Sequence, residues 1–163
     1  MIEAARPAHR DEIGAIADLH RGFVQELASE RGGALFAARD ALEEPLEPCI
    51  EALIEDRDCL VLAGTLDEIL VGMAVAALEP VSGGRRLAWV RALYVVPEAR
   101  EIGVGEALLA AVTTWAAEAG AGGVDVPALP GMRASKNFLE GSGFAARMLV
   151  MHRSLEGWRA ETE

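Results

Sequence analysis

The stretch VPEAREIGVGEALLAA, residues 96–111, decides the fold of this chain. Its two glycines, Gly103 and Gly105, stand one residue apart, after a strand-like run of residues and before a helix-like run. Glycine lets the backbone approach a ligand closely and adopt positive φ angles. A helix N-terminus presents free N–H groups and the positive end of the helix dipole, and both favour an anion. The stretch therefore predicts a turn that binds a phosphate or another anion.

Two common phosphate-binding motifs are excluded by the residues around these glycines. A dinucleotide-binding turn needs a third glycine at position 108, where the chain has Leu108. A P-loop needs Gly-Lys-Ser/Thr after its first glycine, and the turn contains no lysine. What remains is the pattern R-x-x-G-x-G, formed by Arg100, Gly103 and Gly105. On its own this pattern also fits a plain tight turn between a strand and a helix.

The residues on both sides of the turn predict a mixed sheet with helices. Strands are expected over residues 2–8, 59–66, 69–78, 87–96, 122–129 and 144–155. Helices are expected from Asp11 to about Leu27 and over about 40–55, 103–120 and 132–141. The three strands from 59 to 96 follow one another closely, which is typical of an antiparallel meander, whereas strand, helix and strand from 87 to 129 require a parallel pair.

Composition favours one globular domain over residues 1–155, followed by a tail over 156–163. The chain has 163 residues, 52% of them hydrophobic, and its net charge of −11 discourages binding to nucleic acid. No apolar stretch approaches the ~18 residues of a membrane helix, and the N-terminus does not read as a secretory signal. We therefore expect a cytoplasmic protein that binds no membrane. Cys49 and Cys59 lack metal-binding spacing, so no metal site is expected.

Four segments together resemble a known family. The strand LYVVPEAR (93–100) and the following EIGVGEALL (101–109) resemble the acyl-CoA signature of the GNAT superfamily of N-acyltransferases. EAARPAHRDEIGAIADLH (3–20), the hairpin 59–78 and FLEGSGF (138–144) are similar to further parts of the same family. The resemblance spans nearly the whole chain. It implies an α+β, three-layer fold with about four helices around a mixed, mostly antiparallel sheet, splayed open at strands 4 and 5 to take the pantetheine of acetyl-CoA.

The resemblance also implies a set of cofactor-binding residues. The backbone of Leu93, Tyr94 and Val95 is expected to pair with the pantetheine, and Arg100 fills the family's Gln/Arg position. Amides of the turn are expected to hold the pyrophosphate, and Asn137 is a further candidate contact. The turn amides are those of Ile102, Gly103, Val104, Gly105, Glu106 and Ala107. Glu101 and Ile102 stand where the family often has basic or small residues, and Glu106 puts a negative charge beside the anion site.

Catalytic residues are harder to assign. The amide of Val95 is the natural donor to the oxyanion of an acyl-transfer intermediate. Glu79 is the best candidate base, with His152 and Tyr94 as alternatives, because Arg91 and Ala92 stand where relatives often carry an acid. The family's tyrosine position holds Leu139, and the nearby Ser135, Asn137 and Ser142 are no clear substitute. His9 and His20 are expected to be solvated, and Trp89 to lie in the core or in the wall of an acceptor pocket.

Two classes of function therefore stay open. The first is an N-acetyltransferase that moves an acetyl group from acetyl-CoA to a primary amine of a small molecule or peptide, by direct attack in a ternary complex. The second is a catalytically weak or inactive CoA-binding sensor or interaction domain. A homodimer is possible from the resemblance and the apolar last strand. The identity of the amine, and whether the acyl group is longer than acetyl, lie beyond the sequence.

Overall fold

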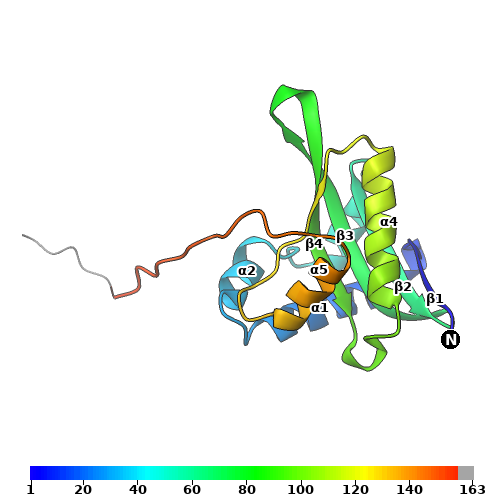
Figure 1. Ribbon diagram of the computed structural model, residues 1–163. Helices are drawn as coiled ribbons and strands as arrows, with labels where there is room; N and C mark the ends of the chain where they lie inside the picture. Colours follow the sequence, from blue (N-terminus) through cyan, green and yellow to red (C-terminus); the bar gives the residue numbers. More distant parts are fainter. Residues whose placement is uncertain (158–163) are drawn as a thin grey trace, which may run out of the picture.

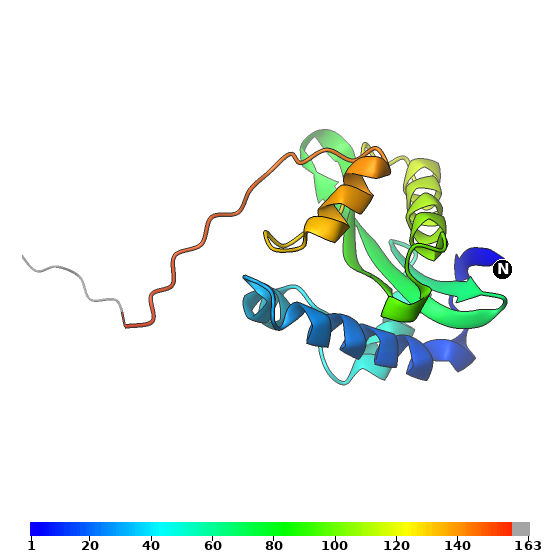
Figure 2. The ribbon, with the colours of Figure 1, turned by 60° about the horizontal axis from the view of Figure 1, so that its bottom comes forward.

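The fold of this chain is a three-layer sandwich, seen in a computed structural model that describes residues 1–157. Five strands form one sheet in the order β1-β2-β3-β4-β5. The strands are β1 Glu3–Pro7, β2 Cys59–Leu66, β3 Ile69–Val81, β4 Arg85–Val95 and β5 Val124–Asp125. The helices are α1 Ile13–Leu27, α2 Gly33–Arg39, α3 Leu46–Glu55, α4 Val104–Glu118 and α5 Arg133–Gly141. Figure 2 shows α1 and α3 on one side of the sheet and α4 with α5 on the other. No helix within the described residues is both long and apolar enough to span a membrane.

The pairing of the strands confirms the expected mixed sheet. The pairs β1–β2, β2–β3 and β3–β4 are antiparallel, and β4–β5 is parallel. The turn between β2 and β3 consists of Asp67 and Glu68, both with positive φ (47° and 68°), as two-residue hairpin turns often require. β4 ends at Val95, two residues before Pro97, which has no backbone N–H to donate to a neighbouring strand.

A β-bulge in β4 explains why the sheet opens. Val75 faces Ala92 and Ala76 faces Val90, so Arg91 is an extra residue on the β4 side. Such a residue bends its strand and increases the local twist. β5 pairs with β4 at Ala88 and Trp89 alone within residues 1–157. β4 therefore turns away from β5 just after their last shared pair, which is the splay expected between the fourth and fifth strands.

The expected helix over about 40–55 is wrong in its bounds, and a further helix lies before it. α3 begins only at Leu46, after Pro45, and Pro48 is accommodated in its first turn, where no backbone donor is needed. α2 starts at Gly33 in a stretch whose glycines suggest a break. A Cβ on Gly33 would stand 1.6 Å from the carbonyl oxygen of Leu27, so only glycine allows α2 to pack against the end of α1.

The expected last strand, 144–155, is absent from the described residues. Residues 145–157 are exposed and form neither helix nor strand, and Figures 1 and 2 show them leading away from the body. Arg147 Nε donates to both carboxylate oxygens of Asp125 at 2.8 and 2.9 Å, so the segment passes β5 before it departs. β5 has only two residues and offers too little edge for a ladder. Of the expected tail over 156–163, only Glu156 and Gly157 lie among the described residues.

Candidate functional site

The start of α4 presents a row of free backbone donors. Gly103 precedes the helix with φ 99°, a left-handed conformation that favours glycine. Across the part of the chain that the structure describes, the N–H groups of 102–106 have no acceptor. The N–H of Ala107, expected to join them, instead donates to the carbonyl oxygen of Gly103 at 3.0 Å. Five consecutive amides are thus available to an anion, and the sixth is used inside the helix.

Arg100 is engaged by its own protein. Its Nε donates to the carbonyl oxygen of Val95 at 2.9 Å, and its Nη2 lies 2.6 Å from Glu26 on α1. The guanidinium stands 5.6 Å from the centre of the Tyr94 ring. Hydrogen bonding to Glu26 raises the pKa of Arg100. The charge of Arg100 is therefore balanced by Glu26, a partner that sequence patterns do not predict because the two residues lie 74 positions apart.

The open edge of β4 carries unpaired backbone groups. Val96 N–H donates to the carbonyl oxygen of Val71 at 2.9 Å, so Val96 faces Val71 as a hydrogen-bonded pair. Bonded and non-bonded pairs alternate along an antiparallel ladder, which turns the polar groups of Tyr94 toward Met73. The same alternation turns the N–H groups of Leu93 and Val95 away from β3, toward the side where β5 has diverged. The amide proposed for an oxyanion thus points into the opening.

A cavity of about 300 Å³ occupies this opening. It runs from the start of α4 along β4 to the inner faces of α1 and α2, with residues 126–129 and α5 opposite. Its wall includes Phe23, Glu26, Leu27, Phe36, Val90, Arg91, Ala92, Leu93, Tyr94, Val95, Arg100, Glu101, Gly105, Glu106, Val126, Pro127, Ala128, Leu129, Met132, Ala134, Ser135, Phe138 and Leu139. Most of these side chains are apolar, so the cavity suits a ligand with a long apolar part and polar ends.

The structure brings only some of the expected site residues together. Leu93, Tyr94, Val95, Arg100, Gly105 and Glu106 line the cavity. Glu79 does not: it is exposed and pairs with Leu87, eight residues before Val95, which is roughly 26 Å along a strand. Asn137 is exposed on α5 and does not line the cavity, whereas Ser135 and Leu139 of that helix do. The structure thus does not place Glu79 beside the Val95 amide.

A group of aromatic rings forms the far wall, and sequence reasoning did not assign it to a site. The ring centroids of Phe23 and Tyr94 lie 6.3 Å apart, and those of Phe23 and Phe36 lie 6.2 Å apart at 87°. Tyr94 is the only tyrosine of the chain. Burial, with the nearby carboxylate of Glu26, raises its pKa, so the phenol is protonated at neutral pH. Helical spacing predicts that Phe23 faces inward, but it does not distinguish a residue of the core from one that lines a cavity.

His20 is buried rather than solvated, contrary to expectation. It is 2% exposed, and its Nε2 accepts a hydrogen bond from the N–H of Leu42 at 3.3 Å. Burial lowers its pKa to about 4, although Glu44 acts in the opposite direction. The imidazole is therefore neutral at physiological pH and ties α1 to the segment between α2 and α3. It lies outside the cavity wall.

Comparisons with known proteins identify relatives of this fold. Residues 23–144 match the sequence model of the Acetyltransferase (GNAT) family. A search of curated protein sequences gave no significant match. Among solved structures, the aminoglycoside N-acetyltransferase AAC(6')-Iy in complex with CoA superposes with a TM-score of 0.72 at 16% identity, covering 94% of this chain and 95% of that one.

Two further solved structures are similar to the same extent. The ribosomal-protein-alanine N-acetyltransferase from Brucella melitensis biovar Abortus 2308 has a TM-score of 0.70 and 20% identity, with 94% of this chain and 99% of that chain covered. An aminoglycoside acetyltransferase from an uncultured soil metagenomic sample, in complex with sisomicin, has a TM-score of 0.69 and 18% identity, with 93% and 94% covered. At such identities the likeness is one of fold.

Proposed function

This chain belongs to the Acetyltransferase (GNAT) family, and on that premise we propose that it transfers an acetyl group from acetyl-CoA to a primary amine of a small molecule or peptide. The observation that carries the proposal is the row of free amides at 102–106, placed at one end of a cavity edged by the unpaired N–H groups of Leu93 and Val95. The amides suit the pyrophosphate of acetyl-CoA, and the open edge of β4 suits the two amide groups of its pantetheine.

The reaction is a direct attack in a ternary complex. The neutral amine nitrogen forms a bond to the thioester carbon, the carbonyl oxygen becomes an oxyanion, and the carbon–sulfur bond then breaks to release the thiolate of CoA. The Val95 N–H, which points away from β3, is our candidate donor to the oxyanion. The acceptor's excess proton passes to water, and the thiolate, with a pKa near ~8.5, is a tolerable leaving group. Positioning and oxyanion stabilisation carry most of the rate.

Tyr94 is our candidate for the acid that protonates the departing thiolate. Leu139 stands at the family's tyrosine position, and Glu79 does not line the cavity and lies far from Val95 along the sheet. Tyr94 lines the cavity and its raised pKa keeps the phenol protonated. The Tyr94 hydroxyl, on β4, would then take the role of the tyrosine hydroxyl that the family carries at the Leu139 position on α5.

Glu79 lies far from the Val95 amide and Glu26 is paired with Arg100. This arrangement favours a second candidate function, a CoA-binding domain with weak or no catalysis. The two functions separate when the purified chain is incubated with acetyl-CoA and a panel of amines while free thiol is measured. Thiol release above the buffer rate supports the transferase. CoA binding by calorimetry without thiol release from any amine supports the binding domain, and absence of CoA binding overturns both.

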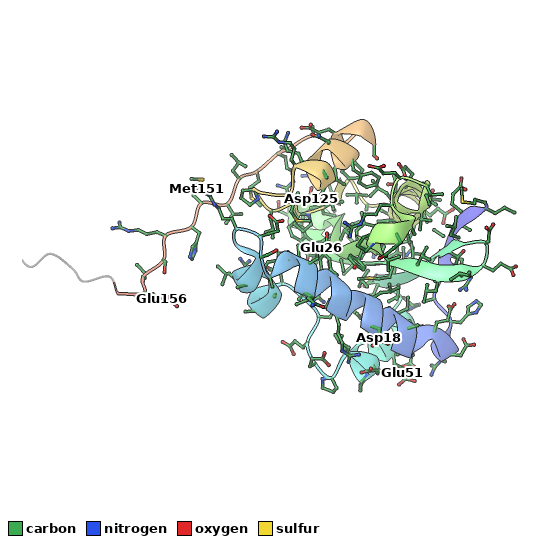
Figure 3. The ribbon with its side chains drawn as sticks, turned by 90° about the horizontal axis from the view of Figure 1, so that it is seen from below. Asp18, Glu26, Glu51, Asp125, Met151 and Glu156 are labelled. Carbon is green, nitrogen blue, oxygen red and sulfur yellow. The ribbon has the colours of Figure 1, made fainter. Side chains whose placement is uncertain are left out.

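Homodimerisation and a cytoplasmic location complete the proposal. The segment 148–151 exposes four large apolar side chains in a row, Met148, Leu149, Val150 and Met151. Figure 3 shows Met151 clear of the body of the molecule. Contiguous exposed apolar surface of this kind marks interaction sites. We propose that a second copy of the chain covers this segment, and that the pair is the working form.

A further inference from the structure

The carboxylates around the cavity are unevenly distributed. Glu101 and Glu106 lie at the α4 turn, beside the amides that suit the pyrophosphate. Where Phe23, Phe36 and Tyr94 form the wall, a part of the cavity here named the aromatic end, the lining carboxylate is Glu26, which Arg100 holds at 2.6 Å. Figure 3 shows Glu26 on the side of α1 that faces the sheet, whereas Asp18 lies on the outer side. The wall therefore offers no unpaired carboxylate at its aromatic end, within residues 1–157.

A cation without a partner lies at this end instead. Arg91, the bulged residue of β4, lines the cavity and is only partly exposed. Within the described chain it makes no hydrogen bond and no ion pair, unlike Arg100 on the same wall. Its neighbours on β4 face α1 and α3: Ala92 belongs to the core cluster that contains Ile16 of α1 and Ile50 of α3, and Tyr94 and Phe23 pack against that cluster.

A partly buried guanidinium without a counter-ion is unfavourable, and a ligand anion would relieve it. The bulge matters here, because the extra residue turns this one side chain out of the regular alternation of β4. Arg91 lies four residues from Val95, roughly 13 Å along an extended strand. Its long side chain can meet a group on a ligand whose amine lies near Val95.

We propose that the acceptor is an amine with an apolar or aromatic body and one anionic group, such as a carboxylate, that Arg91 binds. The inference rests on the proposed acetyl transfer and names the substrate class of the same site. Polycationic amines are disfavoured on the same grounds, because they would meet an unpaired arginine and no unpaired carboxylate at the aromatic end. The acceptor class therefore differs from that of the aminoglycoside acetyltransferases that share the fold.

The test compares matched acceptors. The dipeptide Phe-Ala carries an N-terminal amine, an aromatic body and a carboxylate, and its C-terminal amide lacks only the negative charge. We expect kcat/KM for the acid to exceed that for the amide by about tenfold or more, as for a hydrogen bond to a charged group. Kanamycin, a polycation, is expected to react more slowly than either. Equal kcat/KM for acid and amide, or a preference for kanamycin, overturns the inference while leaving the acetyl transfer standing.

Variants assign the preference to Arg91. Arg91→Gln should raise KM for the acid about tenfold more than KM for the amide, so that the ratio of their kcat/KM values falls toward one. Arg91→Lys should retain part of the preference. Arg85→Gln removes a charge from the exposed start of the same strand and should change nothing. Thermal unfolding of each variant shows whether it is folded, and unchanged selectivity in folded Arg91→Gln overturns the assignment.

A binding experiment keeps the two proposals separable if no amine reacts. N-acetyl-Phe-Ala and its C-terminal amide are titrated into the protein with CoA present, and heat is measured. Tighter binding of the acid, lost in Arg91→Gln, supports the anion site even when the transferase proposal has failed. Equal binding of acid and amide to the unaltered protein overturns it.

Discussion

Arg100 holds the carbonyl oxygen of Val95 through its Nε at 2.9 Å. Arg100 lies just before the turn at 102–106, and its side chain thereby connects that turn to the edge of β4 that faces the cavity. Its other nitrogen reaches Glu26 on α1, so the bond also fixes β4 relative to that helix. We therefore propose that Arg100 acts through Val95 as a positioning residue, because its charge is already balanced by Glu26.

Replacing Arg100 with glutamine should lower kcat more than it weakens acetyl-CoA binding. A hydrogen bond from a charged group is worth ~1.5–3 kcal/mol, so loss of the grip on Val95 is expected to reduce kcat roughly tenfold to a hundredfold. KM for acetyl-CoA should rise less than about tenfold, because Glu26 already balances the lost charge. Steady-state kinetics give both values. Arg10→Gln, at an exposed ion pair with Glu51, is the control. A large rise in KM with unchanged kcat would show that the guanidinium binds the diphosphate.

A side chain at Gly105 should obstruct the cofactor. Its backbone is helical, and a Cβ there would stand 3.3 Å from Cζ of Phe138, across the gap between α4 and α5. Gly105→Val fills that gap, and we expect CoA binding to weaken about tenfold or more, measured by calorimetry. Gly14→Val at the start of α1 meets nothing within 4 Å and is the matched control. Gly103→Val is a poorer test, because φ 99° strains any side chain whether or not CoA binds there. Unaltered CoA affinity in folded Gly105→Val would remove this gap from the proposed site.

Most of the fold could be predicted from the sequence because its signals are local. The hairpin of β2 and β3, the helix α4 and the parallel crossover each follow from periodicity and turn residues within one segment. The helix α2 could not be predicted, because Gly33 in a sequence suggests the end of a helix. Its role becomes clear only in the structure, where the carbonyl of Leu27 lies against it. The last strand failed for a related reason: the apolar run 148–151 has strand propensity, but β5 is too short to pair with it.

The site divides in the same way. The turn depends on backbone, so the pattern around Gly103 and Gly105 predicts its free amides, and the resemblance to the family implies the open strand edge. Binding of acetyl-CoA there stays a prediction. Side-chain roles depend on distant neighbours: the partner of Arg100 is on α1, and Glu79 lies at the wrong end of its strand. In the sequence, Arg91 stands out only because relatives often carry an acid near this position. Its position on a bulge becomes visible when β3 and β4 are paired.

Tyr94→Phe should slow the reaction without weakening acetyl-CoA binding. The substitution removes only the hydroxyl and keeps the ring that contacts Phe23. General acid catalysis contributes about 100-fold or more, so kcat should fall roughly a hundredfold with KM for acetyl-CoA nearly constant. The pH dependence of kcat tests the acid role directly. In the unaltered protein kcat should decrease at high pH, where the phenol, whose pKa is raised, loses its proton. Tyr94→Phe should not show this decrease. An unchanged kcat would mean that the thiolate leaves without an acid.

The buried His20 should make the fold less stable below neutral pH. Its pKa is about 4 in the folded chain against an ordinary value of 6.5, so the unfolded chain binds more protons between these values. Stability should therefore fall as pH drops from 6.5 toward 4, by roughly 3 kcal/mol at most. Urea unfolding at pH 7.5 and 5 measures the change, and His20→Gln should flatten it. The carboxyl of Glu12, whose pKa is held at about 2 by Arg6, titrates in a lower window. An equal decrease in stability between these pH values in His20→Gln would assign the effect to another group.

Polar substitutions in the exposed segment should separate the proposed dimer. Leu149 and Met151 are 84% and 88% exposed, and a side chain of this type stabilises by about 1.5–3 kcal/mol when it is buried. In a symmetric dimer each substitution counts twice, so Leu149→Ser with Met151→Ser should raise the dissociation constant by at least about a hundredfold. Light scattering after size-exclusion chromatography over a range of concentrations gives that constant. Ile69→Ser, at an exposed apolar residue of the β2–β3 hairpin, should leave it unchanged. A chain that stays monomeric at high concentration, or a dimer indifferent to the two serines, would mean that the segment is covered by something other than a second copy.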